Sequence, residues 1–148
     1  DIDVTPCDNS KTKKEGVSRT YKGCDGYAPI MAYMGREGYL INCELREGRQ
    51  HCQKHTPEFI RETIAACRRV TKEPLLFRLD SGNDSSDNIS IFLENGCSFI
   101  TKRNLRRESR ESWLLKGRPS TSGPHGGTSP IPDQMGENIP SPSVQYMR

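Results

Sequence analysis

The pattern of apolar and polar residues predicts a sheet that begins at the start of the chain. Residues Asp1 to Pro6 have the character of a strand. Residues 28–34 are continuously apolar, and after a turn at residues 35–38 apolar and polar residues alternate from Tyr39 to Arg46. This arrangement is typical of an antiparallel hairpin with one face in water.

A helix is predicted next, from about Pro57 to Lys72. Thr56 is a suitable N-cap, proline suits the first helical position, and apolar residues then recur at helical spacing. The short apolar run from Leu75 to Leu79 ends at Asp80. Such a run is typical of a central strand that is covered on both faces.

A second helix is indicated by Ile89, Phe92 and Leu93, with Gly96 as a left-handed cap, and residues 97–101 form the last predicted strand. The order is therefore strand, strand, strand, helix, strand, helix, strand. This is the α/β order of the ribonuclease-H-like fold, with a mixed sheet in which the first and fourth strands lie side by side and parallel.

Two segments lack this periodicity. The stretch between Pro6 and Tyr27 has hardly any apolar residues and predicts a long basic loop, for which a nucleic-acid contact and simple flexibility are equal alternatives. From Gly117 to Arg148 proline, glycine and serine dominate, which predicts a disordered tail that packs little. The predicted domain is thus 1–116, and a frameshift is one hypothesis for the tail at 117–148.

Composition narrows the class of protein. With 148 residues, 32% of them hydrophobic, the chain has room for one domain with a modest core. No apolar run approaches the roughly 20 residues that span a bilayer, and the irregularly spaced cysteines predict reduced thiols, so we expect a cytoplasmic protein without a membrane partner. The chain starts without Met and directly on a strand, which predicts a missing upstream piece.

Three aspartates are candidates for chemistry. Asp1 and Asp3 are two apart on the first strand and project from the same face. Asp80 ends the fourth strand, and ligand sites gather at the carboxyl ends of such strands. Carboxylates suit magnesium, and two metal ions held by such acids activate a water or a 3′-hydroxyl for attack on a phosphodiester.

A purely structural interpretation of Asp80 is also open. Asp80 followed by Ser81 and Gly82 can make an Asx turn, and Asp84 or Ser86 can cap the next helix. In this interpretation the aspartate at the strand end binds no metal.

Four stretches of the chain carry a family resemblance: DIDVT at residues 1–5, GVSRTYKGCDGYAP at 16–29, CELREGRQHCQK at 43–54 and LFRLDSGNDSSD at 76–87. They resemble the transposases of bacterial insertion sequences, within the DDE group allied to insertion-sequence family 1380. The resemblance covers roughly Asp1 to Trp113. It implies an enzyme of metal-dependent DNA cleavage and strand transfer that uses Mg²⁺ (or Mn²⁺) and acts on DNA, as a homodimer when full-length, in the bacterial cytoplasm and nucleoid.

The resemblance also assigns roles to residues. Asp3 matches the first catalytic, metal-binding acid, two residues before a threonine, and Asp80 matches the second, whereas Asp1 is a neighbour without metal contact. The third acid of the family is a glutamate on a later helix, and no stretch of this chain has its context, so the third acid is unknown; Glu108, Glu111 and Glu137 stay unassigned. The chain is therefore expected to be a truncated core that is inactive alone and lacks the region that binds transposon ends.

Two groups of basic residues are candidates for DNA contacts. The group in the predicted loop is Lys11, Lys13, Lys14, Arg19 and Lys22, and the group after the last strand is Lys102, Arg103, Arg106, Arg107 and Arg110. The alternative for the second group is a solvated helix face partly neutralised by Glu108 and Glu111. Two other functions remain open: a nucleic-acid-binding remnant without catalysis, and a ribonuclease-H-like nuclease with a substitute third acid.

Overall fold

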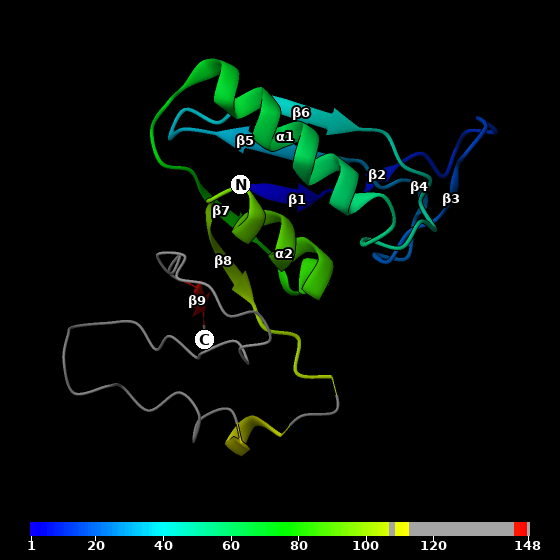
Figure 1. Cartoon of the computed structure of the whole chain (residues 1–148). Coiled ribbons are helices and arrows are strands. Elements are labelled where there is room, and N and C mark those ends of the chain that lie inside the picture. The colour runs from blue at the N-terminus through cyan, green and yellow to red at the C-terminus, as the bar shows by residue number, and fades with distance from the viewer. Residues whose placement is uncertain (107–108, 113–143, 148) are drawn as a thin grey trace.

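A computed structural model describes residues 1–106, 109–112 and 144–147 of the chain. Its main feature is a 6-stranded sheet with the order β6-β5-β1-β7-β8-β9 (Figure 1). The strands are β1 (Ile2–Val4), β5 (Ile30–Met34), β6 (Tyr39–Glu44), β7 (Leu76–Leu79), β8 (Ser98–Lys102) and β9 (Val144–Met147).

The middle of this sheet confirms the predicted fold class. β1 pairs with β5 in antiparallel fashion and with β7 in parallel, with Ile2 opposite Leu79. The first and fourth predicted strands are therefore neighbours. Both crossovers, from β6 to β7 and from β7 to β8, contain a helix, which gives the mixed α/β arrangement of the ribonuclease-H-like fold.

The two helices, α1 (Thr56–Val70) and α2 (Ser86–Glu94), pack against one face of the sheet and against each other (Figure 1). Alternate residues of each strand point to this face and form the core with the apolar sides of the helices. The core includes Ile2, Ile30, Phe59, Ile60, Phe77, Leu79, Phe92 and Phe99. The ring of Phe92 lies between those of Phe77 and Phe99, at centroid distances of 4.9 and 5.4 Å.

The helix starts differ from those predicted. Thr56 is the first residue of α1 and not its N-cap. His55 occupies the N-cap position with φ 61, and its side chain makes no capping hydrogen bond. The Thr56 hydroxyl instead donates to the Cys52 carbonyl and accepts from Arg46. The cap of α2 is Ser85, whose hydroxyl accepts from the Asn88 N–H. The left-handed cap at the end of α2 is confirmed, since Gly96 has φ 60.

The prediction of a long loop between Pro6 and Tyr27 is wrong, since this stretch contains a small 3-stranded antiparallel sheet with the order β2-β4-β3. Its strands are β2 (Cys7–Asp8), β3 (Ser18–Arg19) and β4 (Asp25–Tyr27), too short to leave an alternating pattern. A glycine permits their close approach: a Cβ on Gly26 would lie 1.9 Å from the Cys7 carbonyl oxygen.

The predicted tail after Gly117 contains one described strand, β9. β9 lies parallel to β8 at the edge of the main sheet, with Phe99 opposite Val144 and Lys102 opposite Met147. The pairing uses main-chain groups, and the four residues of β9 are too few for periodicity to reveal them. Residues 117–143 and 148 of the predicted tail lie outside the described residues. In the described chain, no helix is both long and apolar enough to span a membrane.

Candidate metal and DNA site

Asp3 and Asp80 lie at the carboxyl ends of two neighbouring parallel strands. Ile2 of β1 is opposite Leu79 of β7, and both are buried beneath the helices. The next residue on each strand is the aspartate, and both aspartates are exposed. Because side chains alternate along a strand, Asp3 and Asp80 emerge together on the side of the sheet away from the helices.

The ion pair between Arg78 and Asp1 lies on the same face of the sheet as Asp3 and Asp80. Arg78, two residues before Asp80, binds both carboxylate oxygens of Asp1, two residues before Asp3, through Nε and Nη2. The side chains of positions 1 and 78 thus meet across β1 and β7. Arg78 neutralises Asp1, whereas neither Asp3 nor Asp80 has an ion pair among the residues described.

Asp80 makes a turn and still has one free oxygen. Its Oδ1 accepts hydrogen bonds from the Gly82 N–H at 3.1 Å and the Asn83 side-chain amide at 2.9 Å, which caps the short 3-10 helix η1 (Ser81–Asn83). Within the described structure, Oδ2 accepts no hydrogen bond. The structural interpretation and a role in metal binding are therefore compatible, because each uses a different oxygen.

The two carboxylate oxygens of Asp3 also differ in their contacts. The Thr5 hydroxyl, two residues along on the same face, donates to Asp3 Oδ2 at 3.3 Å. This contact gives a physical reason for the aspartate-x-threonine pattern. Oδ1 has no such contact in the residues described.

Two asparagines that the sequence pattern did not indicate, Asn83 and Asn88, hold the Asp80 side chain in place. Asn83 and Asn88 are each nearly fully buried, and the Asn88 amide donates to the Asn83 carbonyl at 2.9 Å. Asn88, at the start of α2, thus holds Asn83, and the Asn83 side-chain amide donates to Asp80. These two hydrogen bonds fix the orientation of the Asp80 carboxylate. The only signal in the sequence was two asparagines within one short polar run, which also fits an exposed turn.

The loop before α1 packs against the Asp80 turn. The Cys52 thiol and the Gln53 side-chain amide both donate to the Gly82 carbonyl at 3.1 Å. Burial, and next the nearby Asp80 charge, raise the pKa of Cys52, so the thiol stays protonated. A Cβ on Gly82 would lie 3.2 Å from the Cys52 sulfur, which accounts for glycine two residues after Asp80.

A buried arginine holds this loop in place. Arg46 is only 2% exposed, and its Nη1 donates to the Cys52 carbonyl at 3.1 Å and to the Thr56 hydroxyl at 3.0 Å. Its Nε and Nη2 bind both carboxylate oxygens of Glu44. The end of β6, the loop and the start of α1 are thereby joined beside the Asp80 turn.

The donors at this edge fit a hard divalent cation. The open oxygens belong to two carboxylates, which magnesium and manganese prefer over sulfur or nitrogen. In the described ranges no group of three or more His, Cys, Asp or Glu side chains comes together, so Cys52 does not complete a cluster with the two aspartates.

A family comparison decides the class of protein. Residues 1–110 match the family model described as Transposase DDE domain group 1. The chain belongs to the DDE transposase family. Members of this family act on DNA in transposition and generally use divalent metal ions. Comparison with curated proteins and with solved structures gives no match for this transposase.

The first basic group of the transposase belongs to the small sheet and its connections, which extend beyond the carboxyl end of β1 (Figure 1). Arg19 is on β3, and the lysines lie in the segments between the strands. All members of the group are exposed: Lys11, Lys13, Lys14, Arg19 and Lys22. Arg19 has an ion pair with Asp25 at 3.6 Å between two largely exposed side chains, which leaves it accessible.

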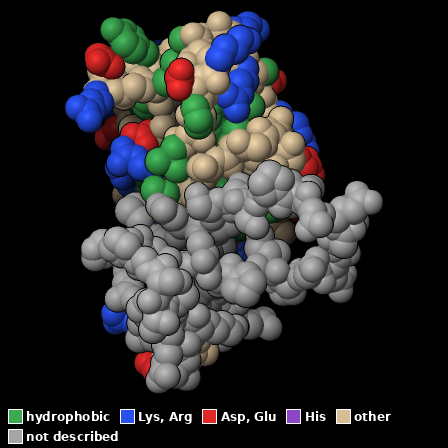
Figure 2. Space-filling model, turned by 60° about the vertical axis from the view of Figure 1, so that its left-hand side comes forward, with side chains coloured by type: hydrophobic (Ala, Val, Ile, Leu, Met, Phe, Trp, Pro, Cys, Tyr) green, Lys and Arg blue, Asp and Glu red, His purple; other side chains and the backbone are tan. Residues whose placement is uncertain are grey.

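The second basic group is divided by the structure. Lys102 and Arg110 are exposed, but Arg103 forms an ion pair at 2.8 Å with Asp84, and Arg106 donates to the Asp84 carbonyl at 2.9 Å. Arg107 lies outside the described residues. The fully buried Asp84 carboxylate thus holds Arg103 within the protein, and a DNA contact by the second basic group stays a prediction. Figure 2 likewise shows Lys and Arg side chains scattered among hydrophobic and acidic ones on the coloured part of one face.

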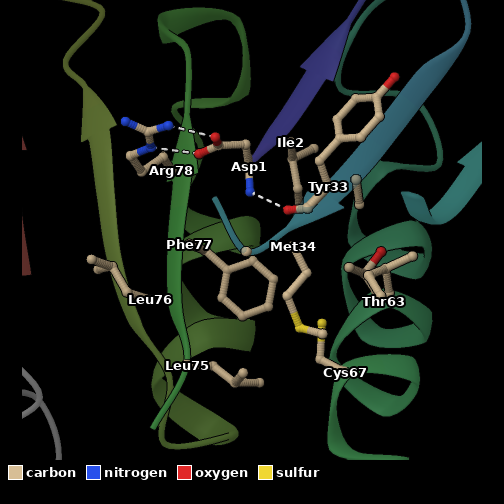
Figure 3. Close-up of a pocket in the computed structure, with 13 residues that line it drawn as sticks. Asp1, Ile2, Tyr33, Met34, Thr63, Cys67, Leu75, Leu76, Phe77 and Arg78 are labelled. Carbon is tan, nitrogen blue, oxygen red and sulfur yellow. Dashed lines mark hydrogen bonds and ion pairs between the residues drawn. The ribbon is translucent and has the colours of Figure 1, made fainter. Parts of the chain in front are cut away.

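A pocket of about 220 Å³ lies at the opposite end of β1 and β7. The ion pair of Asp1 and Arg78 forms one side, and the sulfur atoms of Met34 and Cys67 point toward each other across it (Figure 3). This pocket is at the amino end of the strands, whereas Asp3 and Asp80 lie at the carboxyl end. It is therefore separate from the candidate metal site.

Proposed function

We propose that Asp3 and Asp80 are two of the metal-binding acids of a transposase catalytic core that cleaves DNA and transfers the strand. The observation that carries this proposal is their placement, one residue beyond the paired Ile2 and Leu79 on adjacent parallel strands. Family membership over residues 1–110 supports the same chemistry and a core that fills most of residues 1–116.

The side chains around the acids fit this role. Thr5 engages Oδ2 of Asp3, and Gly82 and Asn83 engage Oδ1 of Asp80, which leaves one oxygen of each carboxylate for Mg²⁺ or Mn²⁺. A bound divalent ion supplies charge stabilisation for the entering and leaving oxygens of a phosphodiester. The protein fixes the position of the two carboxylates, because residues two or three positions further along the chain hold each of them by hydrogen bonds.

We further propose that these 148 residues bind DNA but do not cleave it by themselves. The family resemblance calls for a third acid, and in residues 1–106, 109–112 and 144–147 no third carboxylate joins Asp3 and Asp80. The lysines of the first basic group and Arg19 are all exposed, so they are available to contact phosphates. Such contacts weaken steeply with salt, through counterion release.

The experiment is a salt titration of binding to a fluorescent duplex, with Mg²⁺ or Mn²⁺ added in parallel to test for cleavage. We expect no cleavage and weak binding. A triple substitution of Lys11, Lys13 and Lys14 by Gln should lower the slope of log affinity against log salt by about 0.9 for each phosphate that the protein no longer neutralises.

A matched control removes three exposed charges at α1 and just beyond it, in the variant Arg61→Gln, Arg69→Gln, Lys72→Gln. Its salt slope should stay close to that of the parent chain. Equal slopes in all three proteins would reject the small sheet as a DNA contact. Cleavage that Asp80→Ala abolishes would show that the chain has a third acid and is a complete nuclease.

A further inference from the structure

Tyr21 is the most exposed large hydrophobic side chain of the described structure, at 71%. It is nevertheless on an ordered turn between β3 and β4. The Gly23 N–H donates to the Thr20 carbonyl at 3.0 Å, and the buried Thr20 hydroxyl donates to the Cys24 carbonyl at 2.9 Å. Gly23 has φ 84, which only glycine adopts readily, so the turn that presents Tyr21 is specified by the sequence.

The polar end of Tyr21 is bound to the strand that carries Asp3. Its hydroxyl donates to the Val4 carbonyl at 3.2 Å, one residue beyond Asp3. Partial burial raises the pKa of Tyr21, and the negative charges of Asp3 and Asp80 raise it further. The phenol group therefore lies within electrostatic reach of both carboxylates, while the ring faces solvent.

The surroundings of the ring do not suit an apolar protein partner. The other exposed large hydrophobic side chains are on β6, at the ends of β6 and α1, and on β7: Tyr39, Leu40, Leu45, Val70 and Leu76. By contrast, Lys22 follows Tyr21 directly and is exposed, and the small sheet carries the remaining basic side chains of the first group. An exposed flat ring that is followed directly by an exposed lysine matches a nucleotide, which has a π-face for the ring and a phosphate for the lysine.

We propose that Tyr21 stacks on a nucleobase beside Asp3 and Asp80, next to the phosphate that a divalent ion held by these two carboxylates would contact. This inference rests on the proposed function. The hydroxyl bond to Val4 holds the ring in place before DNA arrives, so little side-chain freedom is lost on stacking. A base that stacks on Tyr21 has to leave its own helical stack, so the site favours an unpaired or frayed end over a fully paired one.

The test uses a hairpin duplex with 2-aminopurine as a single unpaired terminal base, titrated with the full chain at low salt. Stacking on the ring should quench the fluorescence. Tyr21→Phe should keep the quenching, and Tyr21→Leu should lose it together with about tenfold in affinity for the unpaired end. Circular dichroism of each variant checks that the fold is retained.

Two further variants make the result specific. Tyr39→Leu removes another exposed tyrosine, on β6, and should quench as the parent chain does. The quenching is measured without metal, so Asp80→Asn should keep it while it impairs Mn²⁺ binding in a separate titration. Failure of the metal proposal is thereby distinguishable from failure of the stacking proposal. Quenching and affinity that persist in Tyr21→Leu, or equal affinity for paired and unpaired ends, would overturn the inference.

Discussion

The buried carboxylate of Asp84 should contribute strongly to stability. Its side chain is 0% exposed, and Oδ2 accepts from Arg103 Nη1 and from the Asn104 N–H, each at 2.8 Å. These bonds attach the segment after β8 to the start of α2. Asp84→Asn keeps the shape of the side chain but removes its charge.

The size of the expected decrease in the free energy of unfolding depends on how exposed Arg103, the partner of Asp84, is. Removing one member of a fully buried ion pair costs about 3–5 kcal/mol, because the other charge stays buried. The Arg103 side chain is 28% exposed, so water can solvate part of its charge. We therefore expect Asp84→Asn to lower the free energy of unfolding by about 2 kcal/mol, near the value of one charge-assisted hydrogen bond.

Urea unfolding followed by circular dichroism measures this change. Glu62→Gln, which neutralises an exposed acid of α1, is the control and should change stability by less than about 0.5 kcal/mol. In a double-mutant cycle with Arg103→Gln, the coupling energy should be about 1 kcal/mol or more. Fully additive effects, or a decrease for Asp84→Asn no larger than for the control, would refute the ion-pair argument.

Three further perturbations test the parts around the site. Arg46→Met should lower the free energy of unfolding by about 3 kcal/mol in the same urea assay, because it removes a buried guanidinium and leaves its acceptors unpaired. Gly26→Ala should open the small sheet, since the new Cβ would lie 1.9 Å from the Cys7 carbonyl oxygen; amide exchange should speed up in β2 and β4 and stay slow in β7. Asp80→Asn should lower the pKa of Cys52 and speed its alkylation by iodoacetamide at mildly alkaline pH, because the aspartate charge helps to keep the thiol protonated; an unchanged rate would mean that the two groups do not interact.

The main sheet was predictable because its strands and helices have strong periodic patterns. The run from Leu75 to Leu79 and the alternation from Tyr39 onward each correspond to an observed strand. The small sheet was not predictable, because strands of two or three residues are too short to show an alternating pattern. β9 was not predictable either, because its four residues follow a long stretch rich in proline, glycine and serine. The close approach at Gly26 depends on contacts between segments that no local pattern encodes.

The candidate site was predictable only in part. Strand order together with the family resemblance singled out Asp3 and Asp80, and the structure places their strands side by side. The support from Asn83 and Asn88 was missed, since a buried asparagine and an exposed one look alike in a polar run. The ion pair of Arg103 was missed for a related reason: charge spacing along the chain does not tell whether a buried partner is near.

Manganese binding tests the central claim most directly. Titration with Mn²⁺, followed by the electron paramagnetic resonance signal of the free ion, should show one site in the parent chain and in Asp25→Asn, which removes an exposed acid of the small sheet. Asp3→Asn and Asp80→Asn should each abolish that site, and Asn83→Ala should weaken it by about tenfold, as expected for a residue that orients a ligand. Equal Mn²⁺ affinity in the parent chain, Asp3→Asn and Asp80→Asn would contradict the assignment of these two aspartates as metal-binding acids.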